Sequence, residues 1–121
     1  MQREVEPVDI RCTLKKNSDF RRLYSKGKSA VNPFVVVYCR RNREKHNRLG
    51  YTVSTKLGHA VVRNRVRRRL REIYRLNADT FKTGYDIVIV ARARCVEAEY
   101  KKLEAAVLDA CEKLELLETR P

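Results

Sequence analysis

Apolar residues recur along this chain at two different spacings, and the switches between them predict an alternation of helices and strands. Near the N-terminus the spacing is three and four residues, the period of a helix with one apolar side. The large residues of this helix are Phe20, Leu23 and Tyr24. Asn17 or Ser18 suits the start of the helix as a cap, and Gly27 suits its end.

Three later segments have the patterns of strands. Residues 34–41 alternate between two faces, and residues 49–56 alternate again after a polar loop, which predicts an antiparallel return strand. Residues 85–92 carry an apolar run on both faces, as expected of a central strand covered on both sides. A final helix is expected over about residues 97–117. Its regularly spaced apolar stripe consists of Tyr100, Leu103, Val107, Ala110, Leu114 and Leu117.

The segment between His59 and Arg75 combines an apolar stripe with a dense set of basic residues. At about 100° per residue, its apolar positions fall in one narrow sector, which predicts a helix lying on a core. These positions are Val62, Val66, Leu70 and Ile73. The rest of the circumference carries one acid, Glu72, and seven arginines. The arginines are Arg63, Arg65, Arg67, Arg68, Arg69, Arg71 and Arg75.

This charge pattern favours a nucleic-acid partner. Like charges four residues apart, such as Arg63 and Arg67, repel each other and weaken an isolated helix. A merely solvated helix face normally alternates positive and negative charges, and this one does not. The planar guanidinium of arginine can hold a phosphate with two hydrogen bonds and can stack on bases.

Composition places the positive charge in the body of one domain. The chain has 121 residues and a net charge of +13. Residues 1–96 hold 24 basic and 8 acidic residues, whereas residues 97–121 hold 4 basic and 7 acidic. We therefore expect the C-terminal segment to face away from the polyanion. Residues 1–12 have the composition of an extended, partly disordered arm of this single domain.

Cysteine usage and hydropathy indicate a cytoplasmic protein with reduced thiols. The four cysteines lack the spacing of a zinc site. They are Cys12, Cys39, Cys95 and Cys111. The last three lie in apolar surroundings, which suggests that they pack as small hydrophobic residues. The sequence has no signal peptide and no apolar run of the roughly 18 residues that a membrane span needs.

The catalytic groups of a protein nuclease are poorly represented. The two histidines, His46 and His59, have no evident carboxylate partner, and the few acids of residues 1–96 are scattered. No glycine-rich nucleotide loop is present. The polypeptide is therefore expected to be non-catalytic and to bind no metal or cofactor itself.

The aromatic residues of the first helix and the first strand allow two interpretations. Residues 34–41 carry large side chains on both faces, so one side of the sheet could stay open. Exposed rings beside a basic helix would form a surface for single-stranded nucleic acid. The alternative is ordinary core. The strand at 49–56, the arginine helix and the strand at 85–92 also look like a β-α-β crossover, for which physics favours the right-handed sense.

Residues 56–68 (KLGHAVVRNRVRR) closely resemble the signature of the bacterial ribonuclease P protein subunit. Residues 14–20 (LKKNSDF), Gly27-Lys28 and residues 85–92 (YDIVIVAR) resemble the same family in the same order. The resemblance covers roughly residues 14–114. Two departures are visible: His59 stands where asparagine or lysine is common, and Arg67 where lysine is common. The first leaves the cap of the arginine helix open.

The resemblance implies an α+β fold, an α/β sandwich of helix, strands, basic helix, strand and helix around one four-stranded sheet. It also implies a left-handed crossover, against the general rule. In the family a large catalytic RNA acts with magnesium ions, and the protein binds this RNA and the 5′ leader of precursor tRNA. The positions matching the RNA-binding helix are Arg63, Asn64, Arg65, Arg67, Arg68 and Arg71. The positions matching the leader-binding cleft are Phe20, Tyr24, Val36 and Tyr38.

Three other functions compete with this one. A ribosomal or ribosome-assembly protein would share the small size and high charge. A DNA-binding protein could place the arginine helix in the major groove, although Asn64 is its single base-reading amide, and arginines in this number suit phosphate contact better. A protein-only nuclease is the enzymatic alternative. The resemblance favours RNA partners over DNA or a membrane.

Overall fold

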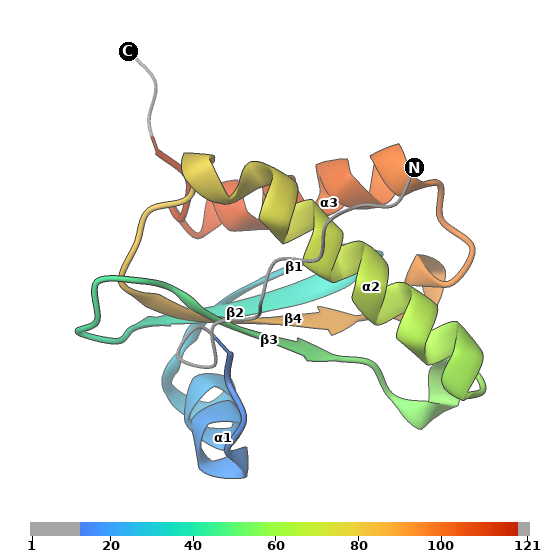
Figure 1. Ribbon diagram of the computed structural model, residues 1–121, viewed down its shortest axis with the longest axis horizontal. Coiled ribbons are helices and arrows are strands. Elements are labelled where there is room, and N and C mark those ends of the chain that lie inside the picture. The colour runs from blue at the N-terminus through green and yellow to red at the C-terminus, as the bar shows by residue number, and fades with distance from the viewer. Residues whose placement is uncertain (1–12, 119–121) are drawn as a thin grey trace.

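The computed structural model describes residues 13–118, which form three α-helices and one four-stranded sheet (Figure 1). The predicted arm at residues 1–12, including Cys12, lies outside this range. The elements in chain order are α1 (Asn17–Lys26), β1 (Lys28–Val31), β2 (Val35–Arg41), β3 (Arg48–Thr52), α2 (Ala60–Asn77), β4 (Tyr85–Ala91) and α3 (Tyr100–Lys113). This is the predicted α+β architecture, with one additional strand that the pattern did not identify, β1.

The sheet has the strand order β1-β2-β4-β3, with β3 parallel to β4 and the other pairs antiparallel. The prediction that residues 49–56 pair with residues 34–41 is therefore wrong, because β4 lies between the two strands. Ile87, Val88 and Ile89 of β4 point to both faces of the sheet and are almost completely buried. A central position between two other strands therefore removes the largest apolar area from water. The parallel pair joined by α2 is the predicted β-α-β crossover. Its left-handed sense stays a prediction from the resemblance.

Two of the predicted elements end earlier than expected, and one strand was missed. β3 ends at Thr52, because Ser54 caps a short 3₁₀ turn, Thr55–Leu57, that precedes α2. The last helix begins only after Glu99 and ends at Lys113. β1 has four residues, of which three are exposed, so it carries too little apolar alternation to be detected.

The main core lies between the sheet and the pair α2 and α3, which cover the same face (Figure 1). The predicted stripes point into it: Val66, Leu70 and Ile73 of α2 are buried, and so are Leu103 and Val107 of α3. Cys39, Cys95 and Cys111 are free thiols buried in this core, as expected of small apolar residues. No helix formed by the described residues is long and apolar enough to cross a membrane.

Among residues 13–118, α1 is the one helix that covers the opposite face of the sheet (Figure 1). A small second core forms there from Leu14, Leu23 and Val88. Gly50 of β3 makes it possible for α1 to lie close, because a Cβ at this position would stand 2.8 Å from the ring of Phe20. The helix ends at Gly27 as predicted, but the cap prediction for its start is wrong. Lys16 is the N-cap residue, and it makes no side-chain capping bond.

Candidate nucleic-acid interface

The α2 helix exposes part of its arginine set while its apolar stripe is buried. Arg65 and Arg68 are exposed, and within residues 13–118 neither side chain makes a hydrogen bond or an ion pair. Arg67 donates to the Oδ1 atom of Asn64 at 3.0 Å. Arg63 is half-buried and donates from Nε to the carbonyl oxygen of Gly58 at 3.1 Å, which ties the first turn of the helix to the preceding loop.

The remaining arginines of α2 have intramolecular partners. Arg69 donates to the carbonyl oxygen of Ala98 at 2.8 Å and so links α2 to the segment before α3. Arg75 forms an ion pair with Glu72 at 2.9 Å. These two arginines are the ones that the family pattern did not assign to RNA binding. The guanidinium of Arg71 lies 6.0 Å from the ring centre of Tyr51, within the range of a cation–π contact.

Aromatic rings of α1 and β2 line a cleft on the sheet face that α1 covers only in part. The rings of Tyr24 and Tyr38 meet edge to face, with centres 4.9 Å apart and an interplanar angle of 72°. Phe20 lies 6.5 Å from Tyr24 and packs on Gly50. Tyr24 is 41% exposed, whereas Phe20 and Tyr38 are half-buried and belong partly to the small core. Both earlier interpretations of the aromatics therefore apply to Phe20 and Tyr38.

A single cross-strand row forms the floor of this cleft. The strand registers place Val31, Val36, Val90 and Thr52 side by side across all four strands. The row beneath α1 is closed, since Val88 is fully buried. In the open row Val36, Val90 and Thr52 are half-buried and Val31 is 57% exposed. In the part of the chain that the structure describes, α1 thus covers one side of the sheet only in part and leaves this row open.

A groove lies at the β3 edge of the sheet, between α1, the end of β3 and α2. Its wall on the α1 side includes Phe20 and Tyr24, and on the α2 side it reaches Arg67. It is also lined by residues that the sequence pattern did not mark as site residues. These are Asn17, Arg21, Tyr51, Thr52 and Val53. The groove therefore joins the α1 wall of the aromatic cleft to the arginine helix, whereas Val36 and Tyr38 are not among its lining residues.

Comparison with known proteins identifies the family. The family model described as Ribonuclease P matches residues 10–115. The chain belongs to the ribonuclease P protein family. It is 47% identical over 104 residues to the ribonuclease P protein component of Alkaliphilus metalliredigens, covering 86% of this chain and 94% of that protein. The corresponding protein of Clostridioides difficile is 42% identical, with coverages of 85% and 91%.

Solved ribonuclease P proteins have the same fold. The Staphylococcus aureus protein superposes with a TM-score of 0.82 at 32% identity, covering 88% of this chain and 98% of that chain. The Thermotoga maritima protein gives a TM-score of 0.75 at 32% identity, with coverages of 80% and 92%. The chain is thus the protein component of an endoribonuclease that processes tRNA, and it has an RNA partner in that complex. The alternative of a ribosomal protein is not supported.

The groove residues of this ribonuclease P protein were missed because their positions depend on tertiary contacts. The period of two does separate Gly50 and Thr52 from Tyr51 and Val53. Nothing local indicates which of these faces α1 covers. Tyr51 lies on the α2 side, where burial raises the pKa of its phenol, partly offset by the positive charge of Arg71. The ring is thus a neutral partner for that guanidinium.

The two histidines of this ribonuclease P protein come from different segments, the start of α2 and the loop between β2 and β3. His59 is the N-cap residue of α2, is exposed, and makes no side-chain capping bond, which settles the position of the cap. The backbone carbonyl of His46 accepts a hydrogen bond from Asn42 in the loop after β2. Within residues 13–118, no three histidine, cysteine or acidic side chains gather in a way that could hold a metal ion.

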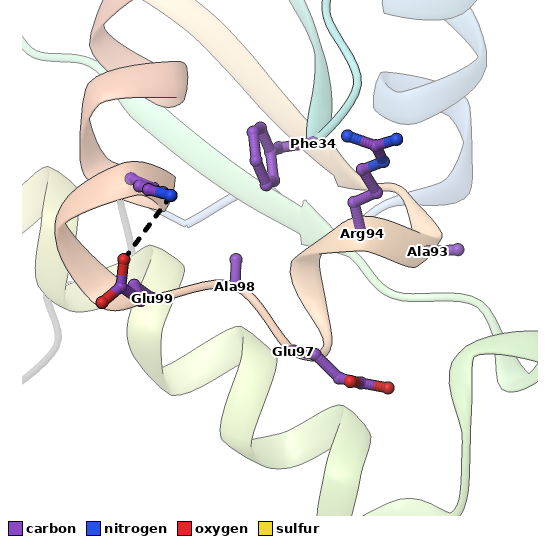
Figure 2. A pocket seen from close by; sticks show the side chains of 7 residues that line it. Phe34, Ala93, Arg94, Glu97, Ala98 and Glu99 are labelled. Carbon is purple, nitrogen blue, oxygen red and sulfur yellow. Dashed lines mark ion pairs between the residues drawn. The ribbon is translucent and has the colours of Figure 1, made fainter.

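A second hollow lies between the start of β2, the end of β4 and the beginning of α3, and it contains none of the predicted site residues. Figure 2 shows Phe34 and Arg94 on one side of it and the ion pair between Glu99 and Lys102 on the other. Its lining mixes both charges, since Glu97 also contributes. Such a lining is less suited to a polyanion than the predominantly basic face of α2.

Proposed function

We propose that the arginine face of α2 binds the catalytic RNA of ribonuclease P and that the aromatic cleft binds the 5′ leader of precursor tRNA. The protein would thereby assist endonucleolytic removal of the leader. The observation that carries this proposal is the groove around β3, which joins Tyr24 in the cleft to Arg67 on the helix. A strand leaving the RNA-bound helix can therefore continue into the cleft without crossing an unfavourable surface.

The charges and contacts of α2 support the first half of the proposal. Arg65 and Arg68 are exposed and free to donate to phosphates, which favours binding to a structured RNA through its backbone. Asn64 is exposed beside them and adds an amide that can donate or accept. Arg63 and Arg71 border the same surface, although each also has a contact within the protein.

The cleft supports the second half. Unpaired bases bind proteins by stacking on aromatic rings while basic residues follow the phosphates. Tyr24 offers an exposed ring. The row that includes Val36 runs across all four strands and offers a largely apolar floor. Arg21 and Arg67 stand at the rim of the groove, where a phosphate backbone would run. A base-paired tRNA end would have no free base to place there.

The chemistry of cleavage is assigned to the RNA. We propose that magnesium ions act on the partner RNA, and that the protein contributes binding energy and positive charge. This division fits a basic surface whose exposed arginines can donate to phosphates. The side chains named above are binding residues, and none is given a catalytic role.

The proposal is tested by replacing Arg65 and Arg68 together with alanine and measuring affinity for the partner RNA as a function of salt. Each lost phosphate contact should lower the slope of log K against log salt by about 0.7–0.9. The matched control removes two positive charges from α3, by replacing Lys102 and Lys113, and should leave the slope nearly unchanged. Unaltered affinity and slope in the α2 variant, with an intact fold by circular dichroism, would remove α2 from the interface.

A further inference from the structure

Tyr24 and Thr52 are joined across the cleft by a bond between their hydroxyl groups. The phenol oxygen of Tyr24 and the Oγ1 atom of Thr52 are 2.9 Å apart, although the residues are 28 positions apart in the chain. One belongs to α1 and the other to β3. The bond therefore connects the wall of the cleft to its floor.

This bond holds a ring that would otherwise be free to move. Tyr24 is 41% exposed, and on its own an exposed tyrosine samples several rotamers. Its ring has two aromatic neighbours, Tyr38 at 4.9 Å and Phe20 at 6.5 Å. Because Tyr38 contacts the ring and Thr52 holds the phenol tip, both ends of the side chain are fixed while one part of the ring surface stays exposed.

Thr52 is itself well held. It pairs with Val90 in the parallel register of β3 and β4, and its half-buried side chain lies in the open row of the sheet. Threonine is branched at Cβ, which leaves few rotamers in a strand. The hydroxyl of Thr52 is thus a fixed point on the sheet to which the phenol of Tyr24 is hydrogen-bonded.

We infer that Thr52 is a positioning residue for the leader site, which orients the Tyr24 ring for stacking before the leader arrives. The inference rests on the proposed leader binding in the cleft. A site that is competent only part of the time binds more weakly in proportion to that fraction. Fixing the ring in advance therefore strengthens binding in addition to any contact that Thr52 makes with RNA as part of the cleft floor.

The test uses the protein assembled with its partner RNA and compares precursor tRNA carrying a leader with mature tRNA. Thr52→Val and Tyr24→Phe each remove one hydroxyl and keep the shape, and each should weaken leader-bearing tRNA by about 2–10-fold. Mature tRNA should change by less than about 2-fold. The double variant should lose no more than either single variant, because both remove the same bond. Thr52→Ser keeps a hydroxyl and should restore most of the affinity.

Three results would overturn the positioning role: wild-type leader affinity in Thr52→Val, equal losses for both tRNAs, or additive losses in the double variant. Tyr24→Ala separates this inference from the proposed function. If Tyr24→Ala removes the leader advantage but Thr52→Val does not, the cleft assignment stands and the role of Thr52 is wrong. If Tyr24→Ala leaves the leader advantage intact, both are wrong.

Discussion

The two faces of the sheet are built from the same strands but are covered to different extents. On one face α2 and α3 bury most of the side chains, and Val37 and Ile89 have at most 1% of their surface exposed. On the other face α1 covers one row of residues and leaves the next row open, where Val31 is 57% exposed. The closed face provides stability, whereas the open face leaves apolar and aromatic surface available to a ligand.

The α2 helix contributes both to the stability of the closed face and to the proposed binding surface. Its apolar stripe closes the first face, while Arg65 and Arg68 point away from the core. Arg67 reaches the groove at the edge of β3 and so connects the helix to the open face. Mutations on the two faces should therefore have separable consequences, and this separation can be tested.

The largest expected effect comes from the closed face. Leu70→Ala removes a fully buried side chain from between α2 and the sheet, and it should lower the free energy of unfolding by about 2–5 kcal/mol. Urea unfolding measures the loss. RNA affinity measured well below the new melting temperature should be nearly unchanged, because Leu70 does not reach the arginine surface. Arg68→Ala is the matched control on the same helix and should show the reverse pattern.

The open face should respond in binding more than in stability. Tyr38→Ala removes a ring that contacts Tyr24, and it should weaken leader-bearing tRNA by roughly 1–3 kcal/mol while mature tRNA is spared. The comparison is made in the assembled enzyme, alongside a melting curve of the protein. Since Tyr38 also packs on the small core, some loss of melting temperature is expected. Equal losses for both tRNAs would give Tyr38 a purely structural role and contradict the proposed difference between the open and the closed face.

High pH should lower the free energy of unfolding through the thiols that are buried in the closed face. Burial raises the pKa of the Cys111 thiol to about 12, with a smaller contribution from Cys39. An unfolded thiol ionises near pH 8.5, roughly, so the folded state keeps a proton that the unfolded state loses. Stability is therefore full below about pH 8.5 and falls as pH rises toward the folded pKa, by about 1.4 kcal/mol per pH unit for one thiol.

Urea unfolding between about pH 8 and pH 10.5 measures this slope. Cys111→Ala should flatten the slope, even though the variant is less stable throughout. Burial also raises the pKa of Cys39 and Cys95, so part of the slope should persist. An unchanged slope in Cys111→Ala would show that this thiol does not control the alkaline loss.

The smallest effect is expected at the start of α2. His59 makes no side-chain capping bond, so His59→Ala should alter the free energy of unfolding by no more than about 0.5 kcal/mol. Cleavage by the assembled enzyme should be nearly unchanged, and the protein without RNA should cleave nothing in the presence of magnesium. RNA-free cleavage that disappears in His59→Ala would instead reveal a catalytic role for this histidine.

The sequence by itself determined the features that depend on the direction of neighbouring side chains. The period of α2 predicted its buried stripe, and the apolar run of β4 predicted its central place. The arginine cluster and the family signature located the candidate RNA surface and the aromatics of the cleft. These features are local, because helix and strand geometry fixes where each side chain points relative to the next.

Only the tertiary structure decided which surfaces meet. The insertion of β4 between β2 and β3, the four-residue strand β1, and the groove around the edge of β3 all depend on contacts between distant segments. The bond between Tyr24 and Thr52 is the clearest case, since neither residue type nor spacing indicates it. Side-chain periodicity specifies a face but not its partner. The partner is set by how the whole chain buries its apolar surface.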